Sequence, residues 1–255
     1  NSIPSTEIER GRTMSDSIRE KRSKDTLGLS GEAIFLISGM NKGCGRFLVL
    51  RDIYLTVCRG ERIVICGPSG SGKSTLIRCI NRLEEHQQGT IVVDNIELTD
   101  DLKQIDNVRR EVGMVFQHFN LFPHLTILEN CTLAPICVRK TPKAEAEEIA
   151  MEYLTRVRIP EQADKYPGQL SGGQQQRVAV ARALVSYPEK GFADEPTGSL
   201  DMKNARDVFK ILLKLKNKNR LIIFATHNRF FANMADCKIE LISGKIKKST
   251  NARIK

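Results

Sequence analysis

Apolar residues follow two patterns along the chain, with short runs or alternations near both ends and longer helical spacings in between. The short segments are bounded by turn-forming residues, as is typical of β-strands. We predict strands at 33–37, 53–57, 63–66, 90–93, 112–116, 221–225 and 238–242. We predict helices at 74–83, 143–157, 173–185 and 204–215, where the apolar residues follow the helical period.

The order of these elements predicts one α/β domain that carries a helical subdomain. Strands stand at both ends of the domain, and a helix-rich insert lies between about 118 and 168. The domain is expected over 30–249. Residues 1–29 are polar and charged without periodicity, which predicts a disordered leader, and 250–255 form a short tail.

Composition and length indicate a globular protein in a reducing compartment. The chain has 255 residues, 40% of them hydrophobic, which is enough for a sizeable core. Its apolar runs are far shorter than the roughly eighteen residues of a bilayer-spanning helix, and no signal-peptide core precedes them. We therefore expect a cytosolic location. Seven cysteines occur without a Cys-x-x-Cys pair, which predicts reduced thiols, mostly in the core, and neither disulfides nor zinc.

The net charge of +10 is concentrated in the last quarter of the chain. Residues 190–255 hold 15 of the 40 Lys and Arg but only 6 of the 30 Asp and Glu, so the first 189 residues are almost balanced. A lysine-rich excess of this kind is typical of a solvated helix face. We expect no nucleic-acid partner.

One glycine-rich segment matches the phosphate-binding pattern G-x-x-x-x-G-K-[ST]. It consists of Gly67, Pro68, Ser69, Gly70, Ser71, Gly72, Lys73, Ser74 and Thr75. The segment follows a predicted strand and precedes a predicted helix, which favours a nucleotide site over a simple glycine-rich turn. In such a site Lys73 reaches the β- and γ-phosphates, and the Ser74 hydroxyl binds Mg²⁺.

A second anion-binding pattern opens the helix predicted at 173–185. It consists of Ser171, Gly172, Gly173 and Gln174, about a hundred residues after the first. A helix cap is the alternative explanation. With both patterns in place, the chain resembles the ATP-binding cassette family, whose signature reads LSGGQ. The resemblance implies a P-loop fold with a RecA-like core, an antiparallel β subdomain and an inserted helical subdomain. It also implies that ATP and Mg²⁺ bind, and that Ser171–Gln174 of one chain cap the γ-phosphate held by a second chain.

The resemblance assigns further roles residue by residue. Gln117 matches the glutamine that contacts Mg²⁺ and the attacking water. Asp194 matches the carboxylate that holds Mg²⁺, and Glu195 matches the general base. His227 matches the histidine that contacts the γ-phosphate, and residues 199–201 match a loop that crosses the dimer interface.

Residues 34–188 are similar to cassettes that drive bacterial uptake of polar and general L-amino acids, above all at 78–86 and 113–130. This similarity implies two transmembrane permease subunits, a second identical ATPase subunit and, indirectly, a periplasmic solute-binding protein. It places the chain on the cytoplasmic side of the inner membrane. The apolar residues after Gln117, namely Phe119, Leu121, Phe122 and Leu125, are expected to face a coupling helix or to pack the helical subdomain.

Three departures from the family pattern stand out. Cys44 takes the place of an aromatic residue that stacks on adenine, which weakens the expected nucleotide affinity. Lys190 and Gly191 fall where a buried strand should carry two apolar residues, and either residue weakens such a strand. Gly198 gives 193–201 a resemblance to lipoprotein-release cassettes, and we hypothesise a seam near residue 188 that reflects divergence, recombination or an error in the assembled gene.

Three alternative functions remain beside amino-acid uptake. The last third favours lipoprotein release or efflux. A cassette protein that acts on DNA or ribosomes is a second alternative, although the 53 residues between Gln117 and Ser171 leave room only for a compact insert. A catalytically impaired relative is the third, because of Cys44, Lys190 and Gly191.

Overall fold

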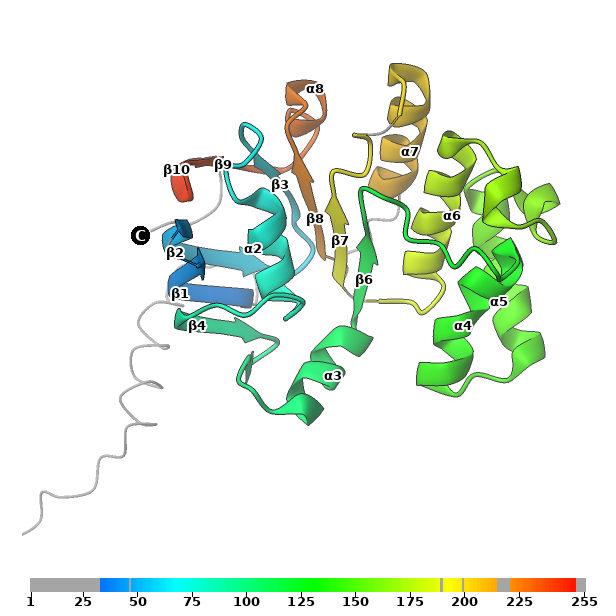
Figure 1. Cartoon of the computed structure of the whole chain (residues 1–255), viewed down its shortest axis with the longest axis horizontal. Coiled ribbons are helices and arrows are strands. Elements are labelled where there is room, and N and C mark those ends of the chain that lie inside the picture. The colour runs from blue at the N-terminus through cyan, green and yellow to red at the C-terminus, as the bar shows by residue number, and fades with distance from the viewer. Residues whose placement is uncertain (1–32, 46, 189, 199, 215–220, 251–255) are drawn as a thin grey trace, which may run out of the picture. The chain divides into compact units, whose positions relative to one another are not determined.

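The computed structural model describes residues 33–45, 47–188, 190–198, 200–214 and 221–250 (Figure 1). The expected leader and residues 251–255 of the expected tail lie outside the described residues. The strands are β1 (Ala33–Cys44), β2 (Phe47–Cys58), β3 (Arg62–Cys66), β4 (Gln88–Val93), β5 (Ile96–Glu97), β6 (Val112–Val115), β7 (Lys190–Asp194), β8 (Leu221–Thr226), β9 (Cys237–Ile242) and β10 (Lys245–Thr250). The α-helices are α2 (Lys73–Ile80), α3 (Leu102–Arg110), α4 (Ile127–Arg139), α5 (Lys143–Arg156), α6 (Gly172–Leu184), α7 (Met202–Lys214) and α8 (Arg229–Ala232). Two short 3-10 helices, Pro160–Gln162 and Pro167–Gln169, lie between α5 and α6.

The strands form two sheets. The smaller is antiparallel, in the order β2-β1-β4-β5. The larger has the order β10-β9-β3-β8-β7-β6 and is parallel from β9 to β6, with β10 antiparallel at its edge. All six residues of β8 are buried, because a parallel sheet is covered on both faces. The parallel strands end at one edge of the sheet, which therefore gathers the residues that follow them.

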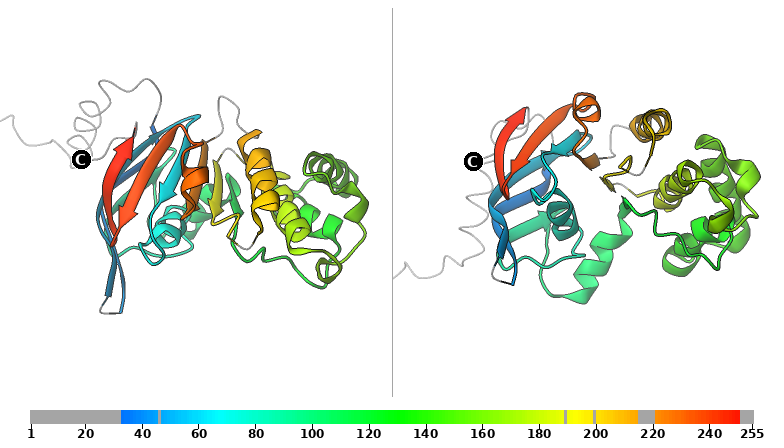
Figure 2. Two further views of the ribbon diagram at one scale, coloured as in Figure 1. Left: turned by 90° about the horizontal axis from the view of Figure 1, so that it is seen from above. Right: turned by 45° about the horizontal axis from the view of Figure 1, so that its top comes forward.

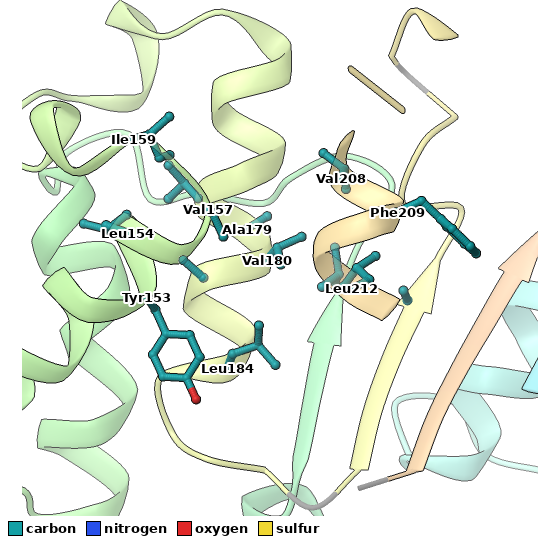
Figure 3. Close-up of a cluster of buried hydrophobic side chains, with 14 of the residues drawn as sticks. Tyr153, Leu154, Val157, Ile159, Ala179, Val180, Leu184, Val208, Phe209 and Leu212 are labelled. Carbon is teal, nitrogen blue, oxygen red and sulfur yellow. The ribbon is translucent and has the colours of Figure 1, made fainter. Parts of the chain in front are cut away.

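Helices α4, α5, α6 and α7 form a layer beyond β6 and β7. Helix α6 lies between α7 on one side and α4 and α5 on the other (Figure 2). Figure 3 shows side chains of α5 (Tyr153), α6 (Val180, Leu184) and α7 (Val208, Leu212) that belong to one buried cluster. The helical layer therefore includes α6 as well as helices within the predicted insert.

The strands and helices predicted from periodicity are present, most with ends displaced by a few residues, whereas β1 ends seven residues later and β2 begins six residues earlier than predicted. Helices α3, α4 and α8 and strands β5 and β10 were not predicted. Pro135 lies inside α4 and interrupts its helical pattern. A capping box at the start of α4, in which Thr126 and Glu129 bond to each other's backbone N–H groups, was the available signal.

Four of the seven cysteines are buried, which agrees with the expectation of core thiols. Burial raises the pKa of Cys79 and of Cys131 to about 12 and that of Cys237 to about 11. These thiols are therefore protonated and unreactive at neutral pH. Cys44 and Cys137 are exposed, and no disulfide joins any of the seven, all of which lie among the described residues.

Lys190, the first residue of β7, is buried, with only 1% of its surface exposed. Its ammonium group forms an ion pair with Asp94 in the turn between β4 and β5, and Arg59 contacts the same carboxylate at 3.1 Å. Strand β7 is nevertheless paired in register with β6 and β8. The sequence led us to expect that burying the lysine charge would weaken the strand. The ion pair offsets that cost.

Removing the carboxylate from this buried pair should destabilise the fold strongly. We expect Asp94→Ala to lower the free energy of unfolding by about 3–5 kcal/mol, because the Lys190 ammonium then stays buried without that anion. Lys190→Met should be close to neutral, since an apolar side chain suits the site. Urea unfolding measures both. Arg59→Met, which removes the half-exposed partner, is the control, and an Asp94→Ala effect no larger than the control's would contradict the expectation.

Gly191 borders a small apolar cavity of about 20 Å³, which Gly113, directly opposite on β6, also lines. A β-carbon at position 191 would come no closer than 3.8 Å to any neighbouring atom. We therefore expect Gly191→Ala to raise the free energy of unfolding by about 0.5–1 kcal/mol. Gly113→Ala is the matched control and should destabilise, because its β-carbon would lie 2.2 Å from the Ala183 carbonyl oxygen. A loss of stability in Gly191→Ala, measured in the same urea titration, would refute this account.

Candidate functional site

The glycine-rich loop joins the end of β3 to the start of α2, as the sequence predicted. Two of its glycines are required by their surroundings. A β-carbon on Gly67, whose φ is 154°, would lie 2.0 Å from the Leu241 carbonyl oxygen. Gly72 has a φ of 99°, and its β-carbon would lie 2.7 Å from Leu50 Cδ2. The loop is therefore packed tightly between β9 and β2, which holds its backbone in one conformation.

The N-terminus of α2 is available for an anion. Its N-cap, Gly72, has no side-chain cap, and its first turn carries no acidic residue. The first N–H groups of a helix have no partner within the helix, and they carry a partial positive charge. Lys73 Nζ lies within the same loop and donates to the Gly67 and Pro68 carbonyl oxygens, at 3.0 Å each. Ser71 Oγ is buried and has no hydrogen-bond partner among the residues described.

The loop serine and the first of two consecutive acidic residues are in contact. Ser74 Oγ donates to Asp194 Oδ1 at 2.6 Å. Asp194 is the last residue of β7, and 2% of its side chain is exposed. The sequence predicted that these two residues share a site, and the structure brings them together. Arg78, which donates to Asp194 Oδ2 at 3.3 Å, was missed. Its position four residues after Ser74 on the same helix was the available signal.

Glu195 lies between the loop lysine and His227. Its Oε1 is 3.6 Å from Lys73 Nζ. Its Oε2 accepts the backbone N–H of His227 at 3.3 Å and lies 3.0 Å from His227 Nδ1. Glu195 has a φ of 47°, a conformation that is uncommon outside glycine and that often marks functional sites. Its N–H donates to the Ala225 carbonyl oxygen at 3.0 Å, which extends the pairing of β7 with β8.

Gln117 is exposed and lies two residues after the end of β6. A β-carbon on Gly198 would lie 3.6 Å both from Gln117 Nε2 and from Glu195 Cβ. The Gln117 amide therefore lies beside the turn that carries Glu195. Ser199 of the predicted interface loop lies outside the described residues.

The second anion-binding segment caps α6. Ser171 Oγ accepts the Gln174 N–H at 3.4 Å, and Gln174 Oε1 accepts the Ser171 N–H at 2.9 Å. Ser171 and Gly172 are exposed. Helix α6 packs against α4, α5, α7 and β6, whereas α2 packs against β2, β7 and β8 (Figure 1). The segment at 171–174 therefore caps α6 and is exposed. It lies on a different part of the fold from the glycine-rich loop of the same chain.

The tip of the β1–β2 hairpin carries the residue that replaces the family's stacking aromatic. Cys44 is exposed and pairs across the hairpin with Phe47, which is 66% exposed. Leu50, three residues further along β2, packs against the loop at Gly72. The hairpin tip therefore lies near the loop and presents an aromatic ring at 47.

The polar groups around Asp194 suit Mg²⁺ bound together with phosphates. The part of the chain that the structure describes has no group of three or more His, Cys, Asp or Glu side chains that could hold a metal by themselves. Mg²⁺ commonly takes one or two protein oxygens and completes its shell with phosphate and water oxygens. Ser74 and Asp194 offer oxygens of this kind next to the loop.

A glycine-rich loop between a parallel strand and a helix, with a carboxylate from a second strand on its serine, defines a P-loop nucleotide-binding protein with an α/β fold. The sequence model described as "ABC transporter" matches residues 50–198, which is more than half of the chain. The chain belongs to the ABC transporter family.

Amino-acid transport proteins are among its relatives. The chain is 62% identical over 224 residues to the "Glutamate/glutamine/aspartate/asparagine transport ATP-binding protein BztD" of Rhodobacter capsulatus, which covers 88% of this chain and 85% of that one. It is 67% identical over 196 residues to the "General L-amino acid transport ATP-binding protein AapP" of Rhizobium johnstonii, covering 77% and 76%. A solved structure of the dimeric ATP-binding cassette MJ0796, bound to ADP and Pi, has a TM-score of 0.79 and 35% identity and covers 85% of this chain and 97% of that one. The fold and the resemblance to amino-acid cassettes are confirmed.

The expected resemblance of the last third to lipoprotein-release cassettes is not borne out. A match over 224 of 255 residues must include 32–224, so the similarity to BztD continues well past residue 188. Strand β7, which begins at Lys190, pairs with β6 and β8 on its two sides. Short resemblances such as that at 193–201 were too little evidence for a change of relatives.

Proposed function

We propose that this protein is the ATP-binding and ATP-hydrolysing subunit of a bacterial ABC transporter that couples hydrolysis to the uptake of polar or general L-amino acids. The observation that carries the proposal is the convergence of Lys73, Asp194, Glu195 and His227 at the carboxyl ends of β3, β7 and β8. Membership of the family and the amino-acid transport relatives support the same function. The ion pair of Lys190 with Asp94 argues against an impaired relative.

Triphosphate binding is assigned to the loop from Gly67 to Thr75. Backbone N–H groups at the start of α2 surround the phosphates, and Lys73 turns from the Gly67 and Pro68 carbonyl oxygens to the β- and γ-phosphates. Ser74, Asp194 and Gln117 would hold Mg²⁺, which when bound would supply positive charge against the phosphates.

Glu195 acts as the general base and His227 positions it. The backbone and ring of His227 hold Glu195 Oε2 in place. Once Lys73 engages the phosphates, Oε1 is free to accept a proton from the attacking water. Phosphoryl transfer needs mainly alignment and charge compensation, and these groups supply both.

A second copy of the chain completes the site. Ser171 uses its oxygen as an acceptor within the cap, so its O–H remains a donor for a phosphate of the partner chain. The exposure of Ser171 and Gly172 supports this role, as does the dimeric form of the related cassette MJ0796. Gly172, Gly173 and Gln174 add the helix N-terminus to the same contact.

A groove beside Gln117 is the proposed docking place of the permease subunits. It has a volume of about 540 Å³, with an apolar wall that includes Phe116 and Phe122 and with Arg109, Arg139 and Arg182 among its cations. Of the apolar residues expected here, Phe119 and Leu121 pack against the helical core, whereas Phe122 lines the groove and is 42% exposed.

Among the described residues, no helix has the length and apolar character to cross a bilayer. In this proposal two permease subunits supply the pathway across the inner membrane, this chain lies on its cytoplasmic side, and a periplasmic solute-binding protein delivers the solute.

Reconstitution tests the proposal. The protein is co-expressed with candidate amino-acid permease subunits, purified from membranes, and placed in proteoliposomes with a matching solute-binding protein. We expect ATP-dependent uptake of labelled L-glutamate or of other polar L-amino acids. Uptake of none of the twenty L-amino acids by a complex that hydrolyses ATP would reject the transport assignment, and absence of hydrolysis would reject the enzymatic one.

A further inference from the structure

Arg78 contacts the buried carboxylate that the proposed function assigns to Mg²⁺. Its guanidinium donates to Asp194 Oδ2 at 3.3 Å and to Glu84 Oε1 at 3.5 Å. The Arg78 side chain is 41% exposed, whereas the Asp194 side chain is 2% exposed. The arginine therefore extends a charged group from the surface to a buried anion.

The two oxygens of Asp194 have different partners. Ser74 donates to Oδ1 and Arg78 donates to Oδ2, and both donors stand on α2, one helical turn apart. Charge-assisted hydrogen bonds of this kind orient a carboxylate as well as stabilise it. If Ser74 turns its hydroxyl toward a metal, Arg78 still holds Oδ2, and Oδ1 keeps its direction toward the metal.

A purely structural role for Arg78 is the alternative. It is the basic residue in the last turn of α2, where a cation interacts favourably with the helix dipole, and its pair with Glu84 lies near the surface. Neither the interaction with the helix dipole nor the pair with Glu84 requires Arg78 to reach the carboxylate at the end of β7. The contact with Asp194 is what distinguishes the two explanations.

We infer that Arg78 is a positioning residue, which holds the Asp194 carboxylate in the orientation that binds the metal of the nucleotide complex. The inference rests on the proposed function, since it concerns the same site. Partners that orient metal ligands in this way typically change metal affinity about 10–100-fold when they are removed.

The test measures metal binding without turnover. Free Mn²⁺, a paramagnetic substitute for Mg²⁺, is titrated by EPR in the presence of ADP for the wild type, Arg78→Met and Arg78→Lys, and ADP affinity is measured separately in EDTA. We expect Arg78→Met to bind Mn²⁺ about tenfold more weakly. The Mn²⁺ affinity of Arg78→Lys should fall between those of Arg78→Met and the wild type, because the charge remains but the planar guanidinium with its several N–H donors is lost. ADP affinity in EDTA should not change.

Arg62→Met is the matched control. It breaks another arginine–aspartate pair, Arg62 with Asp236 at 2.5 and 2.8 Å, at the opposite end of β3 from the loop. Mn²⁺ affinity within twofold of the wild type in Arg78→Met, or tighter, would overturn the inference, as would a parallel loss of ADP affinity in EDTA. Should Arg78→Met fail to fold, the same comparison is made with Arg78→Lys. If the wild type hydrolyses ATP and Arg78→Met binds Mn²⁺ as the wild type does, only this inference is rejected. If the wild type does not hydrolyse ATP, the proposed function is rejected.

Discussion

Replacing Glu195 with glutamine should lower steady-state ATP hydrolysis about 10²–10⁴-fold while nucleotide binding persists. The carboxylate is held by the backbone and ring of His227, with Oε1 3.6 Å from Lys73 Nζ. A glutamine amide fits the same space and can still accept the His227 N–H, so the site stays assembled. It cannot take a proton from water at neutral pH. A single-turnover assay together with equilibrium binding of labelled ATP separates the two effects.

The same variant tests the pairing of two copies. Because Glu195→Gln retains ATP, it should form a dimer in the presence of ATP and Mg²⁺ that light scattering detects and that ADP does not support. Glu148→Gln, on an exposed carboxylate of α5, is the control and should hydrolyse ATP at a normal rate. Normal hydrolysis by Glu195→Gln would remove Glu195 from the role of base. A variant that binds ATP but never forms a dimer would contradict the proposal that Ser171 donates to a phosphate bound by the partner chain.

Replacing Lys73 with alanine should abolish nucleotide-dependent activity. We expect ATP affinity to fall about 10- to 100-fold, as follows from the loss of a charged hydrogen-bond donor. The rate of hydrolysis should fall about 10²–10³-fold, because a positive charge next to the γ-phosphoryl group is lost. Lys73 is 5% exposed and lies between the loop carbonyl oxygens and Glu195 Oε1.

Two further variants control the result. Lys73→Met keeps the apolar stem and should match the alanine variant in activity, which excludes a cavity as the cause. Lys103→Ala removes an exposed lysine at the start of α3 and should behave as the wild type does. Isothermal titration with ATP gives the affinities, and phosphate release gives the rates. Hydrolysis in Lys73→Ala above about one tenth of the wild-type rate would contradict the proposed role of the loop.

Much of the site could be predicted because its chemistry lies in contiguous residues. The pattern from Gly67 to Thr75 specifies a strand, a loop and a helix in sequence order, and the structure has them in that order. Asp194 is the last residue of β7, which is apolar at 192 and 193, and Glu195 follows it directly. Glycine at 191 and lysine at 190 were recognised as departures from the family pattern, but the ion pair that compensates for the buried lysine was not predicted. The Asp94 carboxylate comes from another sheet, and no local pattern links positions 94 and 190.

By itself, the sequence determined the class of fold, the identity of the loop and the separation of two anion-binding segments, because periodicity and turn chemistry are local properties. Only the tertiary structure decided which residues meet. The parallel order of β3, β8 and β7 brings Ser74 to Asp194 and Lys73 to Glu195 over more than a hundred residues of chain. It also placed Arg78 on Asp194 and Asp94 on Lys190. These contacts depend on strand order and on desolvation of charge, and neither can be read from neighbouring residues.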